Sequence, residues 1–133
     1  MICLLDTDIL IYLFKGNQRI RDNLNRVGDK NIIISAISVG ELYFGAYHSQ
    51  ERERNLLNLK IFFAVSQIIP VDEQIAEHFG ELKAELKSKG ELISDSDLFI
   101  AATCLGQEAV LVTGNEKHFR RIDRLKLENW AKE

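Results

Sequence analysis

Short apolar runs alternate along the chain with segments in which apolar residues recur at helical spacing. The runs have the composition of buried strands and cover residues 1–5, 31–35, 65–71 and 109–113, with a last edge strand at 125–127. The helical segments lie at residues 9–14, 38–48, 50–64, 72–90, 97–105 and 116–121. This alternation predicts an α/β fold in which helices cover both faces of a central, mainly parallel sheet.

Local signals predict how several of these helices begin and end. Ser38 and Glu41 have the spacing of a capping box at the start of one helix. Asp72 and Gly90 bracket a strongly amphipathic helix, as its N-terminal cap and its C-terminal stop. Asp95 is the expected cap of the helix at 97–105. Polar residues at helix ends therefore have a structural explanation, against which a functional one must be weighed.

The composition is that of a single soluble globular domain. The 133 residues are 46% hydrophobic and 28% charged, which excludes a disordered or fibrous chain. No apolar run approaches the roughly 20 residues of a membrane helix, and the N-terminus lacks the basic region and cleavage site of a signal peptide. We therefore expect a cytoplasmic protein. Cys3 and Cys104 lie in apolar stretches, as buried thiols do, and no Cys/His cluster has zinc spacing.

Charge is distributed unevenly along the chain. The total is −3, but residues 117–133 carry six basic and three acidic side chains, so that segment is +3 and residues 1–116 are −6. This pattern fits a protein that holds a cation and a polyanion in different places. It also fits a solvated surface segment, which is the simpler explanation of the basic end.

Acidic and amide side chains follow the predicted strands. Asp6 comes directly after the first strand, Glu41 lies in the first turn after the second, and Asp97 lies in the first turn of a later helix. Asn115 follows the strand that ends at Thr113. Because the carboxyl ends of parallel strands meet at one edge of a sheet, we expect these side chains to converge. Taken singly, each could serve only as a helix cap or a partner of a helix dipole.

Three converging carboxylates repel one another unless a cation neutralises them. Oxygen ligands without His or Cys suit Mg²⁺ or Mn²⁺ rather than zinc. Such a metal can activate a water molecule and hold the oxygens of a phosphodiester. The constellation therefore predicts metal-assisted phosphoryl transfer or phosphodiester hydrolysis.

Four segments resemble, in order and spacing, the PIN-domain family and especially the VapC-type toxins of bacterial and archaeal toxin–antitoxin pairs. They are residues 4–8, 38–46, 97–103 and 111–119, and the ending at 125–130 is similar too. The resemblance runs from about residue 2 to residue 130. It implies one PIN domain over residues 1–133 with a three-layer α/β/α fold. The implied activity is that of a Mg²⁺- or Mn²⁺-dependent endoribonuclease that inhibits translation.

The resemblance also implies roles for individual residues. The acids that match the family's metal ligands are Asp6, Glu41 and Asp97. The polar residues that match positions lining the site are Thr7, Ser38 and Thr113. Asn115 occupies a position often held by a fourth acid, and it can still ligate or orient a water through its carbonyl. Asp95 is expected as a cap or an auxiliary acid that shares the role of general base with Asp97. The expected products carry a 5′-phosphate and a 3′-hydroxyl.

The implied partners are an RNA substrate such as tRNA or rRNA, a small VapB-like antitoxin, and a second copy in a homodimer. The basic residues nearest the site motifs, and thus the candidates for phosphate contacts, are Lys15, Lys117, Arg120 and Arg121. Apolar residues at 43–47 and 56–63 are candidates for antitoxin contacts, with a place in the core as the alternative. His118 is expected to have a surface or packing role.

Three other functions remain open from the residues. Asp6 and Asp8 after a strand also fit a haloacid-dehalogenase-like phosphatase with Asp6 as covalent nucleophile, although the chain is short for that fold. A phospho-receiver domain has a similar alternation, with Asp72 as the candidate phosphorylated residue, but no Lys ends a strand as that function needs. A PIN scaffold that only binds RNA or protein is the third alternative, and the intact set of acids speaks against it.

Overall fold

A five-stranded, entirely parallel sheet forms the centre of the computed structural model, which describes residues 1–132. The strand order is β3-β2-β1-β4-β5. The strands are β1 (Cys3–Leu5), β2 (Ile32–Ser35), β3 (Ile68–Ile69), β4 (Val110–Val112) and β5 (Lys126–Glu128). In register, Cys3 lies opposite Ile32 on one side and Val110 on the other. Glu133, the last residue of the expected domain and of the basic segment, lies outside the described residues.

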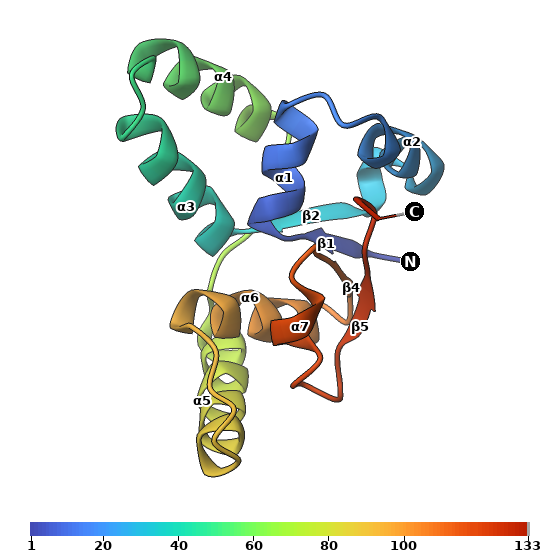
Figure 1. Cartoon of the computed structure of the whole chain (residues 1–133), viewed down its shortest axis with the longest axis vertical. Coiled ribbons are helices and arrows are strands. Elements are labelled where there is room, and N and C mark those ends of the chain that lie inside the picture. The colour runs from blue at the N-terminus through green and yellow to red at the C-terminus, as the bar shows by residue number, and fades with distance from the viewer. Residues whose placement is uncertain (133) are drawn as a thin grey trace.

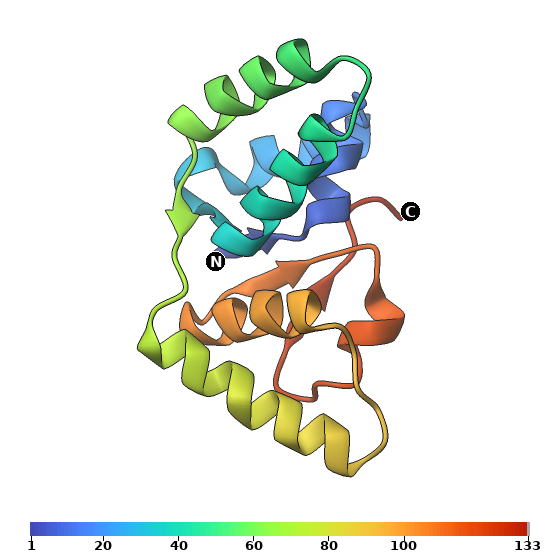
Figure 2. The same cartoon turned by 90° about the vertical axis from the view of Figure 1, so that its left-hand side faces the viewer.

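Helices cover both faces of this sheet. They are α1 (Thr7–Phe14), α2 (Gln18–Val27), α3 (Ala36–Tyr47), α4 (Arg52–Ala64), α5 (Glu73–Ser88), α6 (Asp95–Gly106) and α7 (Glu116–Phe119), with a short 3₁₀ helix, η1 (Asp29–Asn31). In Figure 1, α1–α4 lie above the sheet and α5–α7 below it. Figure 2 shows the same layers from the side. The predicted three-layer α/β/α fold is confirmed. Within residues 1–132, no helix is long and apolar enough to cross a bilayer.

Two hydrophobic cores result, one on each face of the sheet. Side chains alternate along a strand, so Cys3 and Leu5 join the core under α1–α4 whereas Leu4 joins the core under α5–α7. Ile34 and Ile33 divide between the two cores in the same way. Because both faces are covered, the strands read as continuous apolar runs rather than as an alternating pattern.

Helix α2 is the one α-helix among residues 1–132 to which the sequence pattern assigned no structure. Its apolar face is narrow, being formed by Ile20, Leu24 and Val27, and the rest of the helix is polar. Asn17 caps it by accepting a hydrogen bond from the Ile20 amide at 3.1 Å. Gly28 ends it in a conformation with φ of +91°, which favours glycine. Such local signals were present in the sequence, but the apolar pattern was too sparse to draw attention to them.

Two predicted caps are wrong, and both real caps are serines. Ser35 caps α3, accepting from the Ile37 amide at 3.1 Å, so the helix begins before Ser38 and the expected capping box does not form. Ser94 caps α6, accepting from the Asp97 amide at 3.1 Å, and Asp95 is instead the first helical residue. In both cases the capping residue is the last one with extended backbone before the helix, as cap geometry requires.

Candidate active site

Asp6 lies at the point where the central strand passes into a helix. Strand β1 ends at Leu5, and the Asp6 side chain caps α1 by accepting from the Thr7 amide at 2.8 Å. Its other oxygen accepts from the Thr113 hydroxyl, also at 2.8 Å. The Asp6 amide donates to the Val112 carbonyl at 2.9 Å, which continues the pairing of β1 with β4. The backbone of two adjacent strands therefore sets the place of this carboxylate, which is only 5% exposed.

Burial dominates the electrostatics of Asp6. Loss of water around the carboxylate, with smaller contributions from the negative charges of Asp8 and Asp97, raises its pKa from 3.8 to about 7. The hydrogen bonds from Thr113 and Thr7 lower the pKa but do not offset the burial. Asp6 therefore holds a proton up to near-neutral pH, and a nearby cation would favour its release.

Thr7 connects the start of α1 to α3. The Thr7 hydroxyl lies 2.7 Å from Glu41 Oε1 and 2.9 Å from the hydroxyl of Ser38. Because the carboxylate can only accept, the single proton of Thr7 goes to Glu41, and the buried Ser38 hydroxyl donates to Thr7. This short chain of hydrogen bonds orients the otherwise exposed carboxylate of Glu41. Ser38 and Glu41 thus cooperate through Thr7 rather than as a helix cap.

The loop between β4 and α7 connects the site to α6. The Asn115 amide donates to the Thr113 hydroxyl at 2.9 Å, and Asn115 Nδ2 lies 2.9 Å from Nδ1 of His118. The same His118 Nδ1 lies 3.4 Å from Oδ2 of Asp97. An unprotonated Nδ1 accepts from the Asn115 amide, whereas a protonated one donates to Asp97. The expected packing role for His118 is therefore incomplete, since the ring contacts two residues of the site.

Asp8 is the second residue that sequence reasoning missed. Its Oδ2 accepts from the Gly114 amide at 3.0 Å, and its Oδ1 is buried without a hydrogen-bond partner among residues 1–132. Burial raises the pKa of Asp8 more than any other cause. The signal for Asp8 was its place two residues after Asp6, and the signal for His118 was its place one helical turn after Asn115.

Three of the remaining predicted site residues make contacts away from these carboxylates. Asp95 pairs with Lys83 of α5 at 3.0 Å, so its carboxylate serves the α5–α6 contact. Arg121 donates to two backbone carbonyls in the α5–α6 loop at 3.0 and 3.2 Å. Arg120 is 3.8 Å from Glu116 and otherwise exposed. The side chains of Lys15 and Lys117 are exposed, as contacts with a phosphate backbone would need.

The donor atoms near the ends of the strands are of the chemical type that a hard divalent cation prefers. Asp6, Glu41 and Asp97 offer carboxylate oxygens, and Asn115 offers an amide oxygen. The raised pKa of Asp6 marks a place where negative charge lacks compensation. Within residues 1–132, however, no three His, Cys, Asp or Glu side chains come close enough together to form a ready metal-binding group.

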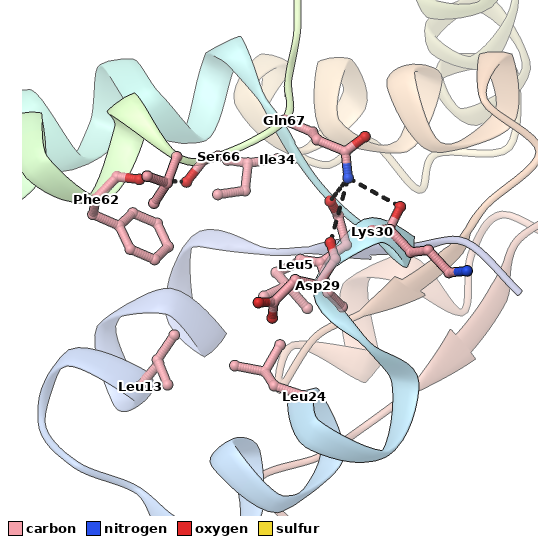
Figure 3. Close-up of a pocket in the computed structure, with 11 residues that line it drawn as sticks. Leu5, Leu13, Leu24, Asp29, Lys30, Ile34, Phe62, Ser66 and Gln67 are labelled. Atoms are coloured by element: carbon pink, nitrogen blue, oxygen red, sulfur yellow. Dashed lines mark hydrogen bonds between the residues drawn. The ribbon is translucent and has the colours of Figure 1, made fainter.

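Two apolar hollows lie on the α1–α4 side of the sheet. One, of about 500 Å³, is lined by Glu41 together with Ile11, Phe14 and Leu59 from three helices. The other, of about 390 Å³, is drawn in Figure 3, where Leu13, Leu24 and Phe62 point toward a common space. The Gln67 amide bounds it by donating to the backbone carbonyls of Asp29, Lys30 and Ile32.

The apolar segments proposed for antitoxin contacts divide between core and surface. Leu59 and Phe63 are buried, as the alternative expected. Other large apolar side chains on α1, α3 and α4 are exposed, among them Ile11, Phe14, Phe44, Tyr47, Leu57 and Ile61. Phe44 is 69% exposed and Ile61 is 62% exposed, which is unusual for side chains of this size.

Known proteins share both this fold and its length. Residues 3–125 match the family described as the PIN domain. Ribonuclease VapC2 of Rickettsia felis is 40% identical over 134 residues, covering 99% of this chain and all of the relative. The tRNA(fMet)-specific endonuclease VapC of Salmonella typhimurium is 34% identical over 129 residues, covering 96% and 97%.

Solved structures agree with this match. VapBC2 from Rickettsia felis, bound to a DNA fragment from its promoter, contains a chain 39% identical to this one with a TM-score of 0.89, covering 98% and 99% of the two chains. DNA-bound VapBC from Salmonella typhimurium gives a TM-score of 0.91 at 33% identity, covering 98% of each chain. The fold and its acidic sheet edge are thus those of a PIN domain. Within that family, the chain belongs to the VapC ribonuclease toxins of toxin–antitoxin pairs, which decides against the phosphatase and receiver alternatives.

Proposed function

We propose that this chain is a metal-dependent endoribonuclease that cleaves RNA phosphodiester bonds, inhibits translation in the cytoplasm and is neutralised by a VapB-type antitoxin. The observation that carries the proposal is the set of carboxylates at the edge of the sheet, each held by a neighbouring polar side chain. Thr113 holds Asp6, Thr7 holds Glu41, and His118 lies beside Asp97. Prepositioned charged groups of this kind support a catalytic role over that of a scaffold.

Asp6, Glu41 and Asp97 would hold Mg²⁺ or Mn²⁺. When bound, such an ion supplies Lewis-acid activation of water and neutralises charge on the phosphodiester. The proton that Asp6 retains up to about pH 7 would leave as the ion binds, so binding strengthens as the pH rises. Asn115 would orient a water or a phosphate oxygen through its side-chain amide, since its position is set by Thr113 and His118.

The reaction is an in-line hydrolysis. Water attacks phosphorus while a carboxylate accepts its proton, the bond from phosphorus to the 3′-oxygen breaks, and the leaving 3′-oxygen takes a proton from solvent to become a hydroxyl. We assign the accepting role to Asp97, whose Oδ2 lies 3.4 Å from Nδ1 of His118. Asp95, the other candidate from the sequence, directs its carboxylate to Lys83 and is the weaker choice. The fragments would carry a 5′-phosphate and a 3′-hydroxyl.

We propose tRNA as the first substrate to examine, because two of the relatives carry the name tRNA(fMet)-specific endonuclease. Lys117 lies two residues after Asn115, and Lys15 follows directly after α1. Both have exposed side chains that can meet RNA phosphates. Arg120 is the third cation of this group, and it is mostly exposed.

The apolar hollow beside Glu41 is the proposed docking place for the antitoxin. Its lining combines apolar side chains with the carboxylate of a proposed metal ligand, so an occupant would lie across the site. Similar chains have been solved as parts of VapBC complexes from Rickettsia felis and Salmonella typhimurium, which supports a VapB-type partner. We also propose a homodimer, as the family resemblance implies.

A cleavage assay tests the activity. The purified chain would be incubated with total cellular RNA and with tRNA, in Mg²⁺, Mn²⁺ or EDTA, and the fragment ends mapped. Asp97→Asn is the test variant and Asp95→Asn is the matched control, since both residues lie in the first turn of α6. We expect discrete 5′-phosphate fragments that disappear with EDTA and with Asp97→Asn but persist with Asp95→Asn. Fragments that persist in all conditions indicate a contaminant, and no cleavage by a folded, metal-binding protein favours a scaffold.

A further inference from the structure

Asp8 connects the first turn of α1 to the loop after β4. Its Oδ2 accepts a hydrogen bond from the Gly114 amide at 3.0 Å, across 106 positions of sequence. Two residues earlier on the same helix turn, Asp6 accepts from the Thr113 hydroxyl at 2.8 Å. The loop is therefore attached to α1 at two successive residues, by two carboxylates of the same turn.

The contact with Asp8 requires glycine on the other side. A Cβ on Gly114 would lie 2.7 Å from Asp8 Oδ2, closer than real Cβ atoms approach another heavy atom. A positive φ does not explain the glycine at position 114, because the glycines with a positive φ are Gly16, Gly28 and Gly90. The close approach of the Asp8 carboxylate is thus the local reason for a residue without a side chain at this position.

The attached loop carries a residue of the proposed site. Asn115 follows Gly114 directly, and its side chain reaches His118, which in turn lies 3.4 Å from Asp97. A shift of the backbone at Gly114 would therefore move Asn115 and disturb the surroundings of Asp97. Thr113 also holds this loop, because its hydroxyl donates to Asp6 and accepts from the Asn115 amide. The contact with Asp8 adds a second attachment, at the residue that lies between Thr113 and Asn115.

We propose that Asp8 is a positioning residue of the ribonuclease site, which through its hydrogen bond to Gly114 holds Asn115 in place against the start of α1. This inference rests on the proposed function. Asp8 acts by geometry, so the hydrogen bond matters and the negative charge does not. Its second oxygen is buried without a hydrogen-bond partner among the described residues. A buried polar atom of this kind lowers the stability of the fold, so stability alone does not explain an aspartate here.

The first test separates the hydrogen bond from the charge. Asp8→Asn keeps the shape and an oxygen that accepts from Gly114, whereas Asp8→Ala removes both the acceptor and the charge. With an RNA that the wild type cleaves, we expect kcat to fall about 10- to 100-fold in Asp8→Ala with KM within about twofold. Asp8→Asn should stay within about threefold of the wild type. Asp22→Ala, on the exposed face of α2, is the matched control for loss of an aspartate.

The second test approaches the same contact from the loop. Gly114→Ala introduces the Cβ that would meet Asp8, so its kcat should fall in the same way. In the double variant Asp8→Ala/Gly114→Ala the effect should be no larger than in the worse single variant, because both changes remove one contact. Additive losses, an unaffected Asp8→Ala, or an Asp8→Asn as impaired as Asp8→Ala would each overturn the inference. A loss confined to KM would do so as well.

An NMR measurement decides the inference independently of cleavage. The Gly114 amide should exchange slowly with solvent in the wild type and in Asp8→Asn, and fast in Asp8→Ala. The side-chain amide resonances of Asn115 should shift in Asp8→Ala and Gly114→Ala but not in Asp8→Asn. If the wild type cleaves no RNA, the proposed function fails, and these resonances still report whether Asp8 places Asn115. If Asp8→Ala does not fold, Asp8→Asn and Gly114→Ala carry the test.

Discussion

The hydroxyl of Thr113 donates a hydrogen bond of 2.8 Å to the buried carboxylate of Asp6, although 107 positions of sequence separate them. The two residues meet because Leu5 and Val112 are partners in the register of β1 and β4, and each strand ends one residue before the contact. A buried acid supported by so few donors is sensitive to pH and to cations.

The stability of the metal-free protein should fall as the pH rises through the titration of Asp6. Folding raises the pKa of this carboxyl from 3.8 to about 7, so the folded state binds a proton that the unfolded chain has released. The stabilisation is complete below about pH 4 and is lost as the pH passes 7. Relative to the wild type, the free energy of unfolding of Asp6→Asn should therefore increase as the pH rises across this window, by at most about 4 kcal/mol. Urea unfolding at pH 4.5 and pH 8 in EDTA measures the difference. If the stability of Asp6→Asn relative to the wild type decreases as the pH rises, the prediction is wrong. In a separate measurement, Mg²⁺ at pH 8 should stabilise the wild type but not Asp6→Asn.

Removal of the Thr7 hydroxyl should impair catalysis through Glu41. Thr7→Val keeps the shape but leaves Glu41 without its donor and the buried Ser38 hydroxyl without its acceptor. We expect kcat to fall about 10- to 100-fold and the free energy of unfolding to fall by about 1–3 kcal/mol. Thr7→Ser, which restores the hydroxyl, should recover most of both. If Thr7→Val cleaves RNA at the wild-type rate, the hydrogen-bond chain has no role in the reaction.

Lys117 and Arg121 should respond differently to substitution, although both were predicted to bind RNA. Lys117 is exposed beside the site, so Lys117→Ala should raise KM and lower the slope of log affinity against log salt by about 0.7 for single-stranded RNA. Arg121 donates to two carbonyls of the α5–α6 loop, so Arg121→Ala should lower the melting temperature and leave KM unchanged. Arg121→Lys distinguishes the two roles, because it restores RNA affinity only if the charge of Arg121 serves RNA.

The exposed apolar side chains of α1, α3 and α4 should matter for the antitoxin and little for the fold. Ile61→Asp changes a side chain that is 62% exposed, so the free energy of unfolding should stay within about 0.5 kcal/mol of the wild type. We expect it to weaken the complex with a VapB-type antitoxin in co-purification. Leu92→Asp, an exposed apolar position after α5, is the matched control. Equal complex formation by both variants would place the antitoxin elsewhere.

Local patterns predicted most elements but not their exact ends. The helix capped by Asp72 was predicted correctly, because its cap and its apolar stripe agree. Helix α3 begins at Ala36, before the predicted start, because Ser35 is both the last residue of β2 and the cap of the helix. A strand that continues straight into a helix leaves no loop residues to mark the boundary, so the serine nearer to Glu41 was the more prominent signal.

The amino-acid sequence by itself determined the class of fold, the candidate acids and the family. These depend on properties that each segment carries alone: apolar runs for strands, helical spacing for helices, and motifs in a fixed order. Only the tertiary structure decided which polar groups act on one another. It assigned Thr113 to Asp6, Thr7 to Glu41, and Asp8 to Gly114. The physical reason is that hydrogen bonds depend on approach within about 3 Å. Such distances are set by strand register and helix packing between segments that lie far apart in the chain.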